Sequence, residues 1–273
     1  MNVYVENVSL EKRMIKNFCE IRNENCFDTM KNMKNSSMDL ILTSPPYNMT
    51  SRRGGYGDRG RYDVYNDWKS EREYLDFTIK LFNEYDRILK ENRIVIYNFS
   101  YSIENPSMPY KLVYEIENKT DWKLVDTIVW KKSCGLPFPA NERRLSRNWE
   151  FVWIFARKNE IDTFEINKGI KSISEKTGQK YYNVFYNFIE AKNNDCKTPK
   201  LNEATYSTEL CLKLLNIYAK DDYVIYDSFM GTGTTLNACK ESKLKLDCIG
   251  SELSSKQCEY ARNRIHEKDM FNL

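Results

Sequence analysis

Two adjacent prolines follow a short apolar segment near the N-terminus. Residues 43–48 read TSPPYN and come directly after the run MDLIL at 38–42. Proline has no backbone N–H and a fixed φ, so a strand cannot continue through both prolines. The strand is therefore expected to end here, with free carbonyls beside a serine hydroxyl and a tyrosine ring. Such a group can bind a planar molecule that carries an amine. The candidate catalytic residues are Ser44, Pro45, Pro46 and Tyr47.

A second candidate site is the glycine-containing segment 227–235, which reads DSFMGTGTT. It lies between a predicted strand and a predicted helix, where glycines permit a tight turn and the helix N-terminus offers free N–H groups. Glu252 ends the next predicted strand, near the offset at which an acidic side chain binds ribose hydroxyls. The pattern is neither G-x-G-x-x-G nor a phosphate loop. Asp227 would favour a cationic ligand, so an adenosine with a sulfonium and an amino acid fits better than NAD or ATP; a plain connecting turn is the alternative.

The elements around these segments alternate between strands and helices. This alternation predicts a mostly parallel sheet covered on both faces. Ligands of such sheets bind beyond the carboxyl ends of strands, so the two candidate segments would face each other if their strands are neighbours. The predicted strands include 38–42, 93–99, 223–227 and 246–250, and the predicted helices include 71–90, 207–218, 234–242 and 254–267.

Composition narrows the class of protein. The chain has 273 residues, of which 41% are hydrophobic and 14% aromatic, enough for a large α/β domain. A net charge of +3 neither requires nor excludes nucleic acid. The eight cysteines form no C-x-x-C pair and His266 is the one histidine, so no metal site is expected and the cysteines are interpreted as reduced, cytoplasmic thiols. No apolar run approaches the roughly 20 residues needed to span a membrane.

The joint order of these motifs resembles the beta group of DNA amino-methyltransferases, S-adenosylmethionine enzymes whose catalytic motif precedes the cofactor motif. Residues 43–47 resemble the serine form of the catalytic motif, and 227–233 resemble the cofactor motif. Residues 249–253 resemble the ribose-binding strand end, and 204–215 the helix before the cofactor strand. The resemblance implies a Rossmann-like fold with a seven-stranded, mostly parallel sheet, one antiparallel strand, helices on both faces and a small target-recognition insertion.

The same resemblance implies a division of the chain and a set of cofactor contacts. Residues 1–157 would form the catalytic half of the methyltransferase domain, 158–200 the target-recognition region, and 201–273 the cofactor-binding half. The family often has Gly-Asp-Cys near the end of its first strand, where this chain has Glu-Asn-Cys at 24–26. The implied S-adenosylmethionine-binding residues are Asn25, Cys26, Thr43, Asp227, Phe229, Met230, Gly231, Gly233, Thr234, Glu252 and Leu253.

In the family, the serine form usually accompanies methylation of cytosine N4 and the aspartate form methylation of adenine N6. The leading hypothesis is therefore methyl transfer to N4 of a flipped cytosine, with adenine N6 as the alternative. The Ser44 hydroxyl and the Pro45 carbonyl would accept the amine N–H bonds and localise its lone pair, and Tyr47 would stack on the base. A catalytically silent DNA-binding component of a restriction-modification system and an NAD-dependent oxidoreductase are hypotheses of other classes.

Double-stranded DNA is the expected partner, with a cognate restriction endonuclease or a second methyltransferase as possible further partners. Arginines occur on a glycine-rich segment at 49–66 and again in 131–147, and arginines on such segments suit phosphate and base contacts. Scattered lysines such as Lys168, Lys171 and Lys176 are interpreted as ordinary solvated surface. The candidate DNA-binding residues are Arg52, Arg53, Arg59, Arg61, Arg143, Arg144 and Arg147.

Overall fold

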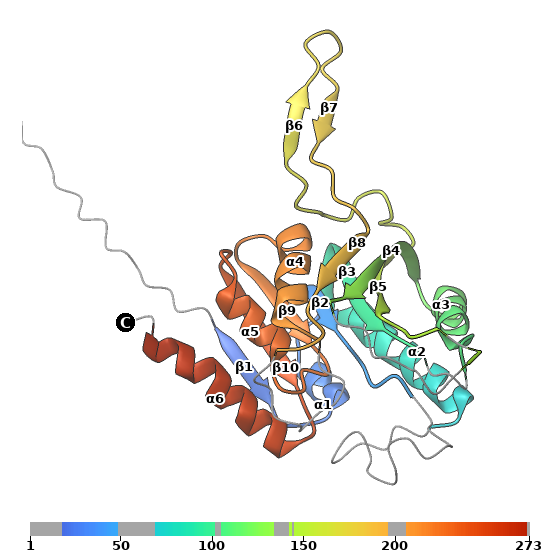
Figure 1. Cartoon of the computed structure of the whole chain (residues 1–273), viewed down its shortest axis with the longest axis vertical. Helices are drawn as coiled ribbons and strands as arrows, with labels where there is room; N and C mark the ends of the chain where they lie inside the picture. Colours follow the sequence, from blue (N-terminus) through green and yellow to red (C-terminus); the bar gives the residue numbers. More distant parts are fainter. Residues whose placement is uncertain are drawn as a thin grey trace, which may run out of the picture.

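One twisted sheet organises the chain, and helices cover both of its faces (Figure 1). The computed structural model describes residues 18–48, 69–101, 105–133, 142–143, 145–195 and 206–271. The strands of the main sheet are β1 (Cys19–Arg22), β2 (Met38–Thr43), β3 (Leu89–Phe99), β4 (Trp122–Lys132), β5 (Trp149–Arg157), β8 (Phe188–Ala191), β9 (Tyr223–Asp227) and β10 (Leu246–Ser251). The helices are α1 (Cys26–Lys31), α2 (Glu71–Ile88), α3 (Met108–Lys119), α4 (Thr208–Tyr218), α5 (Thr234–Glu241) and α6 (Ser255–Phe271).

The strand order in the main sheet is β1-β10-β9-β2-β3-β5-β4-β8. β5 is antiparallel to both of its neighbours, and every other pair in this sheet is parallel. The predicted α/β fold, with a mostly parallel sheet and one antiparallel strand, is therefore confirmed. The sheet has eight strands where seven were expected, because β8, from the region between 158 and 200, adds to the free edge of β4.

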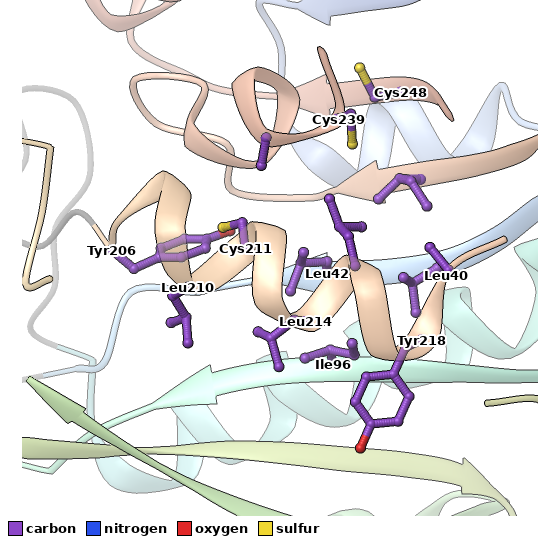
Figure 2. Packing of buried hydrophobic residues seen from close by; sticks show 14 of the residues in the cluster. Leu40, Leu42, Ile96, Tyr206, Leu210, Cys211, Leu214, Tyr218, Cys239 and Cys248 are labelled. Atoms are coloured by element: carbon purple, nitrogen blue, oxygen red, sulfur yellow. The ribbon is translucent and has the colours of Figure 1, made fainter. Parts of the chain in front are cut away.

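Two apolar layers hold the helices against the sheet. Successive side chains of a strand point to opposite faces, so Leu40 and Leu42 pack beneath α4 and α5 while Ile41 packs against α2. Figure 2 shows Leu210 and Leu214 of α4 beside the side chains of β2. The buried cysteines of this layer, Cys211, Cys239, Cys248 and Cys258, are free thiols.

Local sequence explains where α2 begins, and sheet pairing explains where it ends. Ser70 and Glu73 form a reciprocal capping box at its N-terminus. The sequence predicts a helix over 71–90, but α2 ends at Ile88, and Asn92 lies inside β3 with a φ of +56°. The apolar residue Leu89 already pairs with Met38 of β2, so residues 89–90, predicted to be helical, belong to the sheet.

A separate hairpin of β6 (Ile170–Ile173) and β7 (Lys180–Tyr182) projects from the body (Figure 1). It follows β5, whose last residue Arg157 pairs with Trp122 at the start of β4. The hairpin therefore leaves the sheet at the edge where the parallel strands begin, opposite the edge where β2 and β9 end. Among the described residues, no helix is both long and apolar enough to cross a bilayer.

Candidate active site at the ends of β2 and β9

Strands β2 and β9 are parallel neighbours, with Leu40 opposite Ile225 and Ile41 opposite Tyr226. This pairing places the proline segment and the glycine turn side by side, as the sequence predicted for adjacent strands. A direct contact joins them: the Thr43 hydroxyl donates a hydrogen bond to Oδ1 of Asp227 over 2.8 Å. The two candidate segments thus form one site at one edge of the sheet.

The proline segment is fixed by its own hydroxyl groups and by α2. The Oγ atom of Ser44 lies 2.9 Å from the Tyr47 hydroxyl oxygen, and the Tyr74 hydroxyl donates to the Pro46 carbonyl over 2.6 Å. Tyr47 is only 7% exposed and its ring meets Phe99 edge-on at 5.2 Å between centroids. The ring therefore lies at the margin of the core, and its stacking on a base stays a prediction.

Two of these contacts come from residues that the sequence did not single out. Tyr47 donates from its hydroxyl to Oε2 of Glu150 over 3.1 Å, and Nδ2 of Asn98 donates to the same carboxylate oxygen over 2.9 Å. Asn98 also contacts the Tyr47 hydroxyl and lies 3.3 Å from Oγ of Ser44. Both residues interrupt aromatic strand segments, YNF at 97–99 and WEF at 149–151, and a buried polar residue in such a segment is the signal that could have found them.

The glycine turn follows β9 and adopts left-handed conformations that glycine allows. Gly231 and Gly233 have φ values of +52° and +78°, in the left-handed region. A Cβ atom on Gly233 would lie 2.8 Å from Cβ of Ala261, so α6 also requires glycine here. The Gly231 N–H donates to Oε2 of Glu252 over 3.2 Å, which brings the turn against the end of β10.

Asp227 holds this turn in place by hydrogen bonds from its buried carboxylate. Its fully buried carboxylate accepts hydrogen bonds from the Thr43 hydroxyl, the Phe229 N–H, and the hydroxyls of Tyr206 and Thr235. Burial raises the pKa of this carboxyl above its usual range, although the four donors oppose the shift. In the structure the carboxylate accepts hydrogen bonds from donors of its own chain, and a contact with a cationic ligand stays a prediction.

The other predicted cofactor residues surround the turn with different degrees of access. Asn25 caps α1, its Oδ1 accepting from the Phe27 N–H over 3.0 Å, and burial raises the pKa of the Cys26 thiol to about 12. Leu253 is exposed. In the turn itself, Phe229 is half-buried and Met230 is buried. The Thr234 hydroxyl, at the start of α5, accepts a hydrogen bond from Arg264 over 3.3 Å.

Of the predicted DNA-binding arginines, two lie in the described part of the chain. Arg143 is exposed and pairs with Glu142 at 3.3 Å. Arg147 donates to the Tyr101 carbonyl, and its guanidinium carbon lies 5.0 Å from the centroid of the Tyr101 ring. Arg52, Arg53, Arg59, Arg61 and Arg144 lie outside the described residues.

The sequence of this chain is similar to those of known DNA methylases. A family model described as DNA methylase matches residues 38–263. The type II methyltransferase M.HinfI of Haemophilus influenzae is 26% identical over 248 residues, covering 89% of this chain and 67% of that protein. M.MwoI of Methanothermobacter wolfeii is 26% identical over 81% of this chain, which spans 30% of that protein. M2.DpnII of Streptococcus pneumoniae is 25% identical over 94% of this chain and 93% of that protein.

Solved structures share the fold at lower identity. The PvuII DNA methyltransferase (cytosine-N4-specific) superposes with a TM-score of 0.69 at 16% identity, covering 93% of this chain and 92% of that one. A putative DNA modification methylase from Thermus thermophilus, complexed with S-adenosyl-L-methionine, gives a TM-score of 0.61 at 16% identity, with coverage of 91% and 93%. These likenesses establish the same arrangement of strands and helices.

Proposed function

Because this chain belongs to the N6/N4 DNA methylase family, we propose that it transfers a methyl group from S-adenosylmethionine to N4 of cytosine in DNA. One observation carries the proposal. The Ser44 segment, suited to an amine, is joined to the glycine turn by the 2.8 Å contact between Thr43 and Asp227. A base amine at the first segment therefore lies within reach of a methyl donor at the second.

The residues of the turn suit S-adenosylmethionine. Thr232 is 1% exposed, and among the described residues its hydroxyl oxygen has no hydrogen-bond partner, a costly state that a polar ligand group would relieve. Glu252, at the end of β10, has the acceptor oxygens that ribose hydroxyls require. We assign Leu253 and Phe229 to the adenine, because both present accessible apolar surface there. When bound, the cofactor supplies an electrophilic methyl group on a sulfonium.

The proline segment prepares the amine. An exocyclic base amine is a poor nucleophile because its lone pair delocalises into the ring. The Ser44 hydroxyl oxygen and the Pro45 carbonyl accept its two N–H bonds, which favours a tetrahedral nitrogen with a localised lone pair. Holding the nitrogen in line with the methyl carbon then supplies most of the rate, since the sulfonium is already activated. The base reaches Ser44 by flipping out of the duplex.

The assignment to cytosine N4 rests on the serine at position 44, and the cytosine-N4-specific PvuII DNA methyltransferase has the same fold. Adenine N6 is the alternative acceptor. The relatives are type II methyltransferases, so we propose that this chain acts with a cognate restriction endonuclease or a second methyltransferase.

DNA lies along the carboxyl edge of the sheet in this proposal, with residues 1–157 as the catalytic half and 201–273 as the cofactor half. Exposed Arg143 follows β4 at that edge and contributes to phosphate binding. Within the proposed target-recognition region 158–200, we assign DNA contact to the residues after β8, because β8 runs parallel to β4 towards the same edge. The β6–β7 hairpin projects from the opposite edge (Figure 1).

Mass spectrometry of the digested product tests the proposal. The protein is incubated with unmethylated plasmid DNA and S-adenosylmethionine, and the nucleosides are then separated and weighed. N4-methylcytosine is the expected product. N6-methyladenine would replace the cytosine assignment by the alternative. Unmodified DNA, together with no S-adenosylmethionine binding by calorimetry, would favour the catalytically silent DNA-binding component.

A further inference from the structure

A buried carboxylate ends a chain of hydroxyl groups that begins at Ser44. The chain runs from Oγ of Ser44 to the Tyr47 hydroxyl over 2.9 Å and on to Oε2 of Glu150 over 3.1 Å. Glu150 is the second residue of β5, and this antiparallel strand begins at the edge where β2 and β3 end. That is why its side chain reaches the catalytic segment from a distant part of the sequence.

We propose that Glu150 is a positioning residue that fixes the direction of this hydrogen-bond chain and takes up the proton released by the amine; the inference rests on the proposed function. An ionised carboxylate only accepts hydrogen bonds. Tyr47 has one hydroxyl hydrogen and donates it to Glu150. The Ser44 hydrogen must then point to Tyr47, which leaves the Ser44 oxygen to accept an N–H from the base.

The groups around the carboxylate reinforce this direction. Nζ of Lys132 lies 2.5 Å from Oε1 of Glu150, and Nδ2 of Asn98 lies 2.9 Å from Oε2. Both groups only donate, and Asn98 also directs Nδ2 towards the oxygens of Tyr47 and Ser44. A carboxylate that is only 9% exposed needs such partners, because an unpaired buried charge is strongly unfavourable. Lys132 and Asn98 thus keep Glu150 as an acceptor at the end of the chain.

The same chain gives the amine proton a destination. As the nitrogen lone pair forms the N–C bond, the S–C bond breaks and its electron pair stays on sulfur. One amine proton passes to Oγ of Ser44, the Ser44 proton passes to Tyr47, and the Tyr47 proton passes to Glu150. The carboxylate becomes a neutral acid while the positive charge of the sulfonium disappears, so charge and protons balance without another reactant.

A neighbouring ion pair supplies a matched control. Lys131 and Glu190, on β4 and β8, lie 3.0 Å apart, and the Glu190 side chain is exposed. The pair resembles Lys132 and Glu150 in chemistry and strand position, but within the described ranges the Glu190 carboxylate has no hydrogen bond to Ser44 or Tyr47. Glu190→Gln therefore removes one carboxylate from the same sheet edge without touching the chain of hydroxyls.

The test is a double-mutant cycle read by single-turnover methylation. Glu150→Gln keeps one acceptor oxygen, which the Lys132 ammonium requires, so the amide NH2 faces Tyr47 and the chain has no proton acceptor at its end. The methyl-transfer rate is therefore expected to fall about 100-fold, in the range of general acid–base effects. The KM values for DNA and S-adenosylmethionine should stay within about twofold, and Glu190→Gln should keep the wild-type rate. Tyr47→Phe breaks the same chain, so the double variant should be no more than about threefold slower than the slower single variant.

Three results would overturn the inference: a Glu150→Gln rate within about threefold of wild type, losses that multiply in the double variant, or an equal loss in Glu190→Gln. Thermal melting of each variant checks that the fold is kept. If Glu150→Gln fails to fold, Glu150→Asp takes its place; it keeps an acceptor-only group one methylene shorter and should lose about tenfold, and an unchanged rate would contradict the role. Wild-type protein that methylates no DNA would refute the proposed function as well.

Discussion

The carboxylate of Asp227 offers the sharpest test of whether the cofactor turn is held from inside. Replacing Asp227 by Asn keeps one acceptor oxygen and removes the charge. Four donors lose a charged acceptor, and a hydrogen bond to a charged group contributes about 1 kcal/mol more than one between neutral groups. Against this loss of about 4 kcal/mol stands the relief of a buried charge, whose cost is visible in the raised pKa of Asp227. A net destabilisation of about 2 kcal/mol is expected.

Urea unfolding followed by circular dichroism measures this loss, and the melting temperature should fall by about 4–8 °C for a domain of this size. Asp221→Asn is the control. Its carboxylate is exposed and accepts from the Lys245 N–H at the surface, so a change below about 0.5 kcal/mol is expected. An Asp227→Asn protein with wild-type stability and at least tenfold weaker S-adenosylmethionine binding would refute the structural role of the Asp227 carboxylate. It would restore the direct ligand contact that the sequence suggested.

Three further predictions concern the turn, the catalytic serine and the ion pair of Glu165 with Lys220. Gly233→Ala should destabilise by about 2–3 kcal/mol in urea unfolding, because a positive φ is joined by a contact with Ala261, whereas Gly178→Ala, at φ +70° in open space, should cost only about 1 kcal/mol. Ser44→Ala should abolish methyl transfer in a filter-binding assay while calorimetric S-adenosylmethionine binding stays near normal; loss of both would contradict its role. Hydrogen bonds from Lys220 and Tyr223 lower the pKa of Glu165 from 4.5 to about 2, so its contribution is complete above pH 4.5 and disappears as the pH falls towards 2. The stability difference between wild type and Glu165→Gln should shrink over that window, and a difference independent of pH would contradict the assignment.

The sequence was sufficient where a local rule decided the outcome. Prolines 45 and 46 had to end β2, and the glycine turn had to connect a strand to a helix, so the two halves of the site could be expected at one edge of the sheet. Glu150 and Asn98 could not be connected to Ser44 in this way. Their contact depends on the register of antiparallel β5 against β3, which pairs residues more than 50 positions apart.

Strand β8 and the hydrogen-bond partners of Asp227 likewise depend on tertiary pairing. Strand β8 has only four residues with no clear periodicity, and it is a strand because the edge of β4 offers it hydrogen bonds. The four donors to Asp227 could not be named in advance, because they come from the end of β2, the segment before α4, the turn and α5. A residue type indicates that a buried charge needs partners, but it does not say which parts of the chain provide them.

The position of β2 between β3 and β9 also affects how the protein is made. β3 follows β2 closely in the chain, but β9 follows about 180 residues later. At about 5–20 residues per second, a nascent chain waits about 10–35 seconds before the second neighbour of its central strand exists. Stalled chains that end near residue 220 should therefore be cleaved by protease within β2 much faster than the complete protein. During that interval one edge of β2 has no neighbour in the sheet, and an unpaired strand edge is a template for pairing with another copy of the chain.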